Sequence, residues 1–136
     1  MIKLIVGKKG SGKTKTLIEM VNTRLNETKG SVVCIEKGDK LKFDIKYQCR
    51  LIDTVEYQIA DGQSLYGFIA GILASNHDVS DIFVDSALKI CQNKNDDFDQ
   101  FLNELEALLK DRDVECVITS SIAVEDITDT MKKFVG

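Results

Sequence analysis

Glycine and lysine gather near the start of the chain in an arrangement suited to binding phosphate. Residues 7–14 read Gly-Lys-Lys-Gly-Ser-Gly-Lys-Thr, which fits the pattern G-x-x-x-x-G-K-[ST] at every position. Glycines let the backbone turn sharply, so that successive amides point toward one anion. The lysine adds a positive charge, and a helix that begins there adds unpaired N–H groups and the positive end of its dipole. This spacing therefore predicts the binding of a polyphosphate.

Each part of the pattern has an expected task. Lys13 is expected to reach the β- and γ-phosphates as a catalytic cation, and the Thr14 hydroxyl is the expected protein ligand of Mg²⁺. The residues expected to contact the nucleotide are Gly7, Lys8, Lys9, Gly10, Ser11, Gly12, Lys13, Thr14 and Lys15. The alternative is a glycine-rich turn whose lysines are only solvated. An apolar, strand-like run before the pattern and an amphipathic helix after it favour the phosphate site.

The pattern resembles the Walker A motif of the P-loop nucleoside triphosphatases. As topology the resemblance covers most of the chain, but as residues it covers only the motifs. Members of this family also have a Walker B element, an apolar strand that ends in an acid, and residues 82–85 (IFVD) supply one. The resemblance implies that Asp85 holds Mg²⁺, directly or through water, and that the cofactors are ATP and Mg²⁺. An aspartate at the end of a strand is otherwise often a helix cap.

The order of the elements resembles the additional-strand branch of this family, which includes the RecA-like ATPases. A strand over residues 31–36 and a further helix precede the strand of Asp85, and residues 114–119 (VECVIT) follow it. In this branch the last strand lies between the other two, and its polar end is called sensor 1. The resemblance implies that Thr119, followed by Ser120, meets the γ-phosphate or its attacking water. Capping of a final helix is the alternative.

The residue that would activate water departs from the commonest pattern. Many members of the branch carry a glutamate directly after the Walker B aspartate, but Ser86 stands there. RecA-type proteins place their glutamate at the end of the second strand, where Glu36 closes residues 31–36 and Asp39 lies just beyond. The resemblance implies that Glu36, or else Asp39, orients water, with Glu36 favoured and a solvated turn carboxylate as an equally open interpretation. We therefore expect slow hydrolysis, coupled to a protein partner or to self-association as a homo-oligomer.

Three other functions stay open. A deviant Walker A ATPase, which dimerises on ATP, has a lysine where Lys8 stands, but Lys9 replaces the glycine that should follow. A small-molecule kinase usually closes an arginine-bearing lid over the phosphates, and Arg24, Arg50 and Arg112 form no obvious pair. A regulatory or assembly module that binds nucleotide without hydrolysis fits the missing glutamate and the small size. The chain is also similar to small bacterial proteins described as ATP-binding proteins.

Hydrophobic periodicity predicts the elements that position these residues. Strands are expected over 2–6, 31–36, 81–85 and 114–119. A first helix is expected after the phosphate loop, with Gly30 as its C-cap, and a second from Asp61 to about Ser75. Two further helices are expected, one from a capping box at Asp97 onward and one from Ser121 to the C-terminal end. Gly67 and Gly71 are expected to allow close packing. Residues 37–57 are expected to contain one or two short edge strands or a hairpin.

Alternation of strands and helices predicts the α/β class. We expect a three-layer α/β/α P-loop NTPase-like sandwich with a mainly parallel sheet, of strand order 1-4-3-2 plus short edge strands from residues 40–57. Ligands of such sheets bind beyond the carboxyl ends of the strands, and every motif above falls at such an end. The 136 residues are expected to form one domain, 1–136.

Composition limits the environment and the partners. The net charge of -4 argues against a general affinity for nucleic acid. No apolar stretch reaches membrane-spanning length and no signal peptide is recognisable, so we expect a cytoplasmic protein without a membrane span. The four cysteines lack metal-ligand spacing and are expected to be buried free thiols. The single histidine, His77, is expected in a loop, which makes histidine-based catalysis improbable.

Overall fold

The structure, a computed structural model, describes all residues from Met1 to Gly136 and contains one sheet of five parallel strands. The strands are β1 (Ile2–Gly7), β2 (Ser31–Glu36), β3 (Arg50–Asp53), β4 (Val79–Val84) and β5 (Glu115–Ser121). The helices are α1 (Lys13–Glu27), α2 (Gly62–Ser75), α3 (Ala87–Ile90), α4 (Asn95–Leu109) and α5 (Asp129–Lys132), with a 3-10 turn, η1 (Val124–Asp126). The expected α/β class with a parallel sheet is confirmed.

The strands lie side by side in the order β1-β5-β4-β2-β3. Numbered along the chain, this order differs from the expected 1-4-3-2, because the four-residue edge strand β3 takes a number of its own; the other four strands keep the expected neighbours, and a short edge strand from residues 40–57 is confirmed. The hairpin considered for residues 37–57 is wrong. Residues Arg50–Asp53 pair in parallel with Val33–Glu36, and parallel neighbours need a crossover connection, here residues 37–49, rather than a tight turn.

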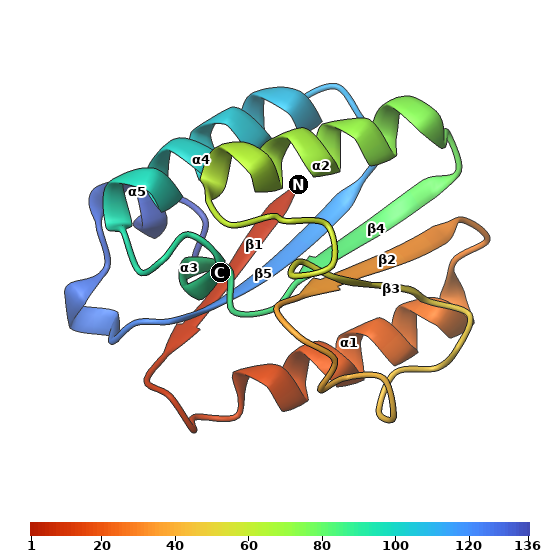
Figure 1. Cartoon of the computed structure of the whole chain (residues 1–136), viewed down its shortest axis with the longest axis horizontal. Coiled ribbons are helices and arrows are strands. Elements are labelled where there is room, and N and C mark those ends of the chain that lie inside the picture. The colour runs from red at the N-terminus through yellow and green to blue at the C-terminus, as the bar shows by residue number, and fades with distance from the viewer.

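Helices cover both faces of the sheet (Figure 1). On one face, α1 and the 37–49 segment enclose a small core that includes Leu17 and Leu41. On the other face, α2, α4 and α5 contribute to the larger core. Adjacent strand residues alternate between the two cores, since Phe83 belongs to the first while Ile82 and Val84 belong to the second. Burial on both faces explains why the apolar run Val32–Ile35 in β2 and the apolar run Ile82–Val84 in β4 are continuous.

The helix starting near residue 61 agrees with its sequence signals. Asp61 is the N-cap of α2, and its carboxylate accepts the backbone N–H of Ser64 at 2.8 Å, while the Ser64 hydroxyl accepts the N–H of Asp61 at 3.2 Å. This reciprocal capping box satisfies amides that the first turn would otherwise leave unpaired. By contrast, α4 begins at Asn95, so the capping box expected at Asp97 is wrong. The Asp97 carboxylate instead accepts the N–H of Gly62 at 2.8 Å.

Three glycines have roles that differ from the expected ones. Gly30 does not cap α1, which ends at Glu27 with Thr28 as its C-cap. A Cβ on Gly30 would lie 2.7 Å from the carbonyl oxygen of Asp78, so the glycine permits close approach of two backbones. A Cβ on Gly67 or Gly71 would meet no neighbouring element within 4 Å, so the close packing expected there is wrong.

The long C-terminal helix expected from Ser121 does not form. Strand β5 continues to Ser121 because every residue of β1 pairs with a residue of β5, and Gly7, the last residue of β1, lies opposite Ser121. The chain then forms η1 and the four-residue α5, which is capped by the Thr128 hydroxyl. Met131 and Phe134 still bury their side chains in the larger core. Apolar spacing therefore identified Met131 and Phe134 as buried, but not the element that buries them, and Val124 from the same pattern is exposed.

Two expectations from composition agree with the structure. Cys34, Cys49, Cys91 and Cys116 are all buried and free. No helix combines the length and the apolar character needed to cross a membrane.

Candidate functional site

The loop between β1 and α1 has a backbone that its glycines make possible. Gly10 and Gly12 have φ angles of 84° and 91°, in the left-handed region that favours glycine. A Cβ on Gly7 would lie 2.6 Å from Ser11 Oγ, so a larger residue there would require the Ser11 hydroxyl to move. Gly12 is the N-cap of α1 and offers no side-chain cap, unlike Asp61 at the start of α2. The first amides of α1 therefore lack a side-chain acceptor, which suits an incoming anion.

Lys13 folds back over this loop. Its Nζ donates to the carbonyl oxygen of Lys8 at 2.9 Å and lies 3.4 Å from Ser11 Oγ. The residue is only 9% exposed. This burial lowers the pKa of the Lys13 ammonium, and the nearby Asp85 carboxylate opposes the shift. A poorly hydrated ammonium held at the loop is a strong point of attraction for phosphate oxygens.

Asp85 joins the loop to the centre of the sheet. It follows β4 directly, and its backbone N–H donates to the carbonyl oxygen of Ile35 at 2.9 Å. The Thr14 hydroxyl lies 3.2 Å and 3.3 Å from the two carboxylate oxygens of Asp85. The Walker A and Walker B candidates, 71 positions apart, therefore meet in space.

The donors at this meeting point suit a hard cation. No group of three or more His, Cys, Asp or Glu side chains gathers anywhere in the chain as a ready-made metal cage. A hydroxyl and one carboxylate, completed by phosphate oxygens and water, are nevertheless the kind of oxygen set that Mg²⁺ takes in phosphate-binding proteins. Thr14 and Asp85 fit magnesium better than a soft transition metal, since no thiolate or imidazole is present at the site.

Thr119 lies beside Asp85 rather than in the open site. It is 1% exposed, its hydroxyl donates to Asp85 Oδ1 at 2.7 Å, and it accepts the backbone N–H of Ser86 at 2.8 Å. Ser86 itself has a left-handed backbone, with φ 56°, that starts α3. Thr119 therefore positions the acid and the turn after it. Ser120 is fully buried, whereas Ser121 lines the cavity described below.

Glu36, the residue expected to orient water, is buried and already hydrogen-bonded in this structure. It is 3% exposed, and its two oxygens accept the backbone N–H groups of Lys40 and Leu41 at 3.1 Å and 3.0 Å. Burial raises the pKa of Glu36, partly offset by these two hydrogen bonds. Glu36 does not line the cavity, and the exposed Asp39 is paired with Lys42 at 3.4 Å. In this structure Glu36 holds a loop in place.

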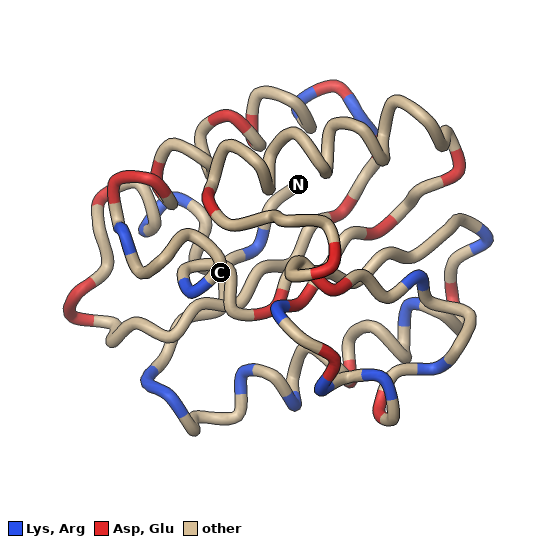
Figure 2. Tube along the Cα trace, viewed as in Figure 1, with Lys and Arg blue, Asp and Glu red and all other residues tan.

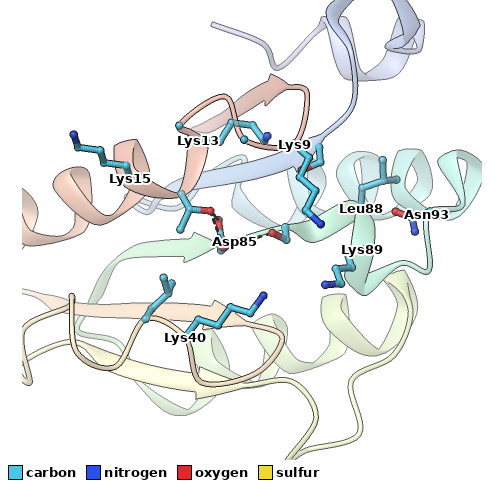
Figure 3. Close-up of a pocket in the computed structure, with 14 residues that line it drawn as sticks. Lys9, Lys13, Lys15, Lys40, Asp85, Leu88, Lys89 and Asn93 are labelled. Atoms are coloured by element: carbon cyan, nitrogen blue, oxygen red, sulfur yellow. Dashed lines mark hydrogen bonds between the residues drawn. The ribbon is translucent and has the colours of Figure 1, made fainter.

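A cavity of about 610 Å³ opens between the phosphate loop, the 37–41 turn and α3 (Figure 3). Of the residues expected to contact nucleotide, six line it, and Gly7, Lys8 and Ser11 do not. The fourteen lining residues are Lys9, Gly10, Gly12, Lys13, Thr14, Lys15, Lys40, Leu41, Asp85, Ser86, Leu88, Lys89, Asn93 and Ser121. Sequence reasoning missed Lys40, Leu41, Leu88, Lys89 and Asn93. Their position just beyond the carboxyl ends of β2 and β4 was the signal available for finding them.

The charges of the chain are distributed unevenly around this cavity. Figure 2 shows blue segments along the phosphate loop and at the turn after β2, although the chain as a whole carries a net charge of -4. The cavity is therefore a locally basic site on an acidic protein, which is a condition for attracting an anion selectively.

Comparison of the chain with models of known protein families found no match, and comparison with curated proteins found none either. The functional assignment therefore depends on the geometry of the site.

Proposed function

We propose that this protein binds a nucleoside triphosphate, with ATP as the leading candidate, together with Mg²⁺, in the manner of a P-loop NTPase. The observation that carries the proposal is the contact of the Thr14 hydroxyl with the Asp85 carboxylate, at 3.2 Å, on the wall of the same cavity as Lys13. A hydroxyl, a carboxylate and a poorly solvated cation that meet at the start of a helix are typical of a site for an anion and a metal ion, and they are not required by a glycine-rich turn that binds no ligand.

The electrostatics of the cavity support a polyanionic ligand. Five lysines line it, and the only carboxylate among the lining residues is that of Asp85. These lysines are Lys9, Lys13, Lys15, Lys40 and Lys89. Only two of the fourteen lining residues are hydrophobic, which suits phosphates better than an apolar molecule. In this proposal the triphosphate lies along the loop amides, with Lys13 at its β- and γ-phosphates.

Magnesium has a defined place in the proposal. Thr14 and Asp85 would hold it, and the ion would supply positive charge that offsets the negative charge of the phosphates. Thr119 contributes indirectly, because its hydrogen bond fixes the Asp85 oxygen that faces Thr14. Asp85 and Thr119 come from the ends of the neighbouring strands β4 and β5, and Thr14 lies in the first turn of α1, which follows β1.

The proposed function has two forms. In the first, the protein hydrolyses the nucleotide slowly, coupled to a partner or to self-association. In the second, it is a module that binds the nucleotide without hydrolysis. One observation favours the second form. Both oxygens of Glu36 are occupied by backbone amides, and Asp85 is the only carboxylate that lines the cavity. Apart from Asp85, which the proposal assigns to Mg²⁺, the cavity wall therefore has no carboxylate that could take a proton from an attacking water molecule.

Calorimetric titration with Mg-ATP tests the binding. Lys13→Ala should lower the affinity for ATP at least tenfold, because hydrogen bonds to a charged group contribute about 1.5–3 kcal/mol. The matched control is Lys29→Ala, which removes an exposed lysine beyond the other end of α1 and should bind ATP like wild type. Wild-type affinity in Lys13→Ala would count decisively against the site.

A phosphate-release assay, read beside the elution volume of the protein with and without ATP, separates the two forms of the function. Release of phosphate supports the ATPase, and binding without release supports the regulatory module. A shift of elution volume that requires ATP supports self-association.

A further inference from the structure

Three of the cavity lysines lie outside the set of Lys13, Thr14 and Asp85 that the proposed function places at the β- and γ-phosphates and Mg²⁺, although the sequence pattern counts Lys9 among the expected nucleotide contacts. Lys9 comes from the phosphate loop, Lys40 from the turn after β2, and Lys89 from α3. Figure 3 shows their side chains directed toward the same open space, whereas Lys15 points away along α1. None of the three forms an ion pair, and none of their amino groups has a hydrogen-bond partner. Converging cations without ion-pair partners favour the arrival of an anion.

The backbone that carries Lys40 is held firmly. The buried Glu36 carboxylate accepts its N–H and that of Leu41, and the Leu41 side chain is buried against α1. Two residues earlier, the N–H of Gly38 donates to Asp53 Oδ1 at 2.8 Å. A buried carboxylate is expensive to desolvate, so its use to fix this turn indicates that the position of Lys40 matters.

The wall that carries Lys89 is also preorganised. Its neighbours Leu88 and Ile90 are 5% and 2% exposed, which fixes the short helix α3 to the core. After α3, Gln92 and Asn93 both have left-handed backbones, with φ angles of 59° and 58°. Such conformations are uncommon for residues other than glycine and persist only where the surroundings enforce them. They place Asn93 on the cavity wall beside Lys89 (Figure 3).

We propose that Lys9, Lys40 and Lys89 form a second anion subsite, which takes the phosphate group of a small phosphomonoester bound together with the nucleotide. The proposal rests on the proposed function, since it assigns Lys13, Thr14 and Asp85 to the Mg-triphosphate and leaves these three lysines for another ligand. A doubly charged phosphate matches a cluster of three cations. The cavity of about 610 Å³ also lies in the middle of the usual range for ligand sites, roughly 300–1,000 Å³.

The test uses the full chain saturated with Mg²⁺ and the β,γ-imido analogue of ATP, titrated with inorganic phosphate in a calorimeter. Wild type should bind phosphate under these conditions. Lys40→Met/Lys89→Met, which keeps the apolar stems, should bind it at least tenfold more weakly. Lys42→Met/Lys94→Met removes two charges from the same two segments outside the cavity lining and should behave as wild type. The altered side chains are exposed, and far-UV circular dichroism checks that each variant is folded.

Two results would overturn the subsite. One is a failure of the analogue-saturated wild type to bind phosphate. The other is equal phosphate binding by the two double variants. If the three lysines serve the γ-phosphate of the same nucleotide instead, Lys40→Met/Lys89→Met will weaken the ATP analogue more than ADP while no additional phosphate binds, which also refutes a second ligand.

Failure of the proposed function gives a different pattern. In that case wild type binds no Mg-nucleotide, and phosphate is titrated into the free protein. Phosphate binding that is lost in Lys40→Met/Lys89→Met but kept in Lys13→Met supports the subsite independently of the nucleotide. Binding that is lost only in Lys13→Met contradicts it.

Discussion

The hydroxyl of Thr119 donates a 2.7 Å hydrogen bond to Asp85 Oδ1 and so links the ends of two neighbouring strands, β5 and β4. The same oxygen of Thr119 accepts the backbone N–H of Ser86, where the chain turns into α3. One buried hydroxyl therefore sets both the orientation of the acid and the direction of the chain that leads to Lys89. In this structure Thr119 acts as a positioning residue, a different task from direct contact with the γ-phosphate.

Replacement of Thr119 tests this positioning role. Thr119→Val keeps the shape but leaves the Ser86 N–H unpaired and removes one donor from Asp85, so the free energy of unfolding should fall by about 1–3 kcal/mol. The Mg²⁺-dependent part of ATP affinity should fall as well. Thr119→Ser retains the hydroxyl and should restore the metal dependence, as measured by urea unfolding and calorimetry. A valine variant with unchanged metal dependence would argue that Asp85 is oriented by other groups.

Asp85→Asn should remove the effect of magnesium on ATP binding while leaving binding in excess EDTA close to that of wild type. The amide keeps the shape of the side chain but loses the charge that a divalent cation needs. We expect the enhancement by Mg²⁺ to fall by about tenfold or more.

Asp81→Asn is the matched control for this change. Asp81 is buried in β4, the strand that Asp85 follows, and its two carboxylate oxygens accept hydrogen bonds from Arg24 at 2.8 Å and 3.0 Å. Neither Asp81 nor Arg24 lines the cavity. This variant should lose stability but retain the magnesium effect. Equal losses of ATP affinity with and without Mg²⁺ in Asp85→Asn would contradict a metal-binding role.

Glu36→Gln should change how stability depends on pH. Burial raises the pKa of Glu36 above its ordinary 4.5, so the folded state holds the proton more tightly than the unfolded state. The wild type should therefore lose stability relative to the glutamine variant as the pH rises from about 4.5 through the raised value, and the difference should then level off. Urea unfolding of both proteins over this window measures it. A difference that is independent of pH would show that Glu36 titrates as in the unfolded chain.

The same variant decides the hydrolytic role implied by the resemblance to RecA-type proteins. If Glu36 orients water, Glu36→Gln should bind ATP normally and stop phosphate release. If Glu36 only holds the turn at Lys40, any turnover of the wild type should persist in the variant. Glu36→Gln keeps one of the two oxygen acceptors that hold the turn, which makes it more informative than an alanine.

Two glycine replacements should have opposite effects on stability. Gly30→Ala would place a methyl group 2.7 Å from the Asp78 carbonyl oxygen and should destabilise the fold by about 1–3 kcal/mol. Gly67→Ala, on the exposed face of α2 with open space around it, should stabilise the fold by about 0.5–1 kcal/mol through helix propensity. Thermal or urea unfolding measures both. Stabilisation by Gly30→Ala would mean that the two backbones can separate at little cost.

The residues near the N-terminus show how far local sequence can be trusted. The strand before the loop, the glycine turn and the helix that begins at Lys13 are all encoded within a few positions of one another, and the structure has all three. The buried strand that ends at Asp85 is equally local. Prediction was less successful where one segment competes with another, as at Asp97, whose carboxylate serves Gly62 of another helix rather than its own.

The C-terminal segment shows the same limit from the other side. Its apolar spacing favours a helix from Ser121, but pairing with β1 extends the strand through that residue. The gain from backbone hydrogen bonds across the sheet outweighs a weak local preference for helix. A comparable competition decides the fate of residues 37–57, where β3 joins the edge of the sheet in parallel instead of folding into a hairpin.

The sequence by itself determined the parts of this protein whose chemistry is contiguous: the glycine bend, the lysine and threonine that follow it, and the acid that closes a buried strand. The tertiary structure alone decided that Thr14 meets Asp85, that Glu36 holds a turn, and that Lys40 and Lys89 enter the same cavity as the loop. The physical reason is that turn and helix signals act over a few residues. The neighbours of a buried charge, in contrast, are chosen by the packing of strands that are distant in the chain.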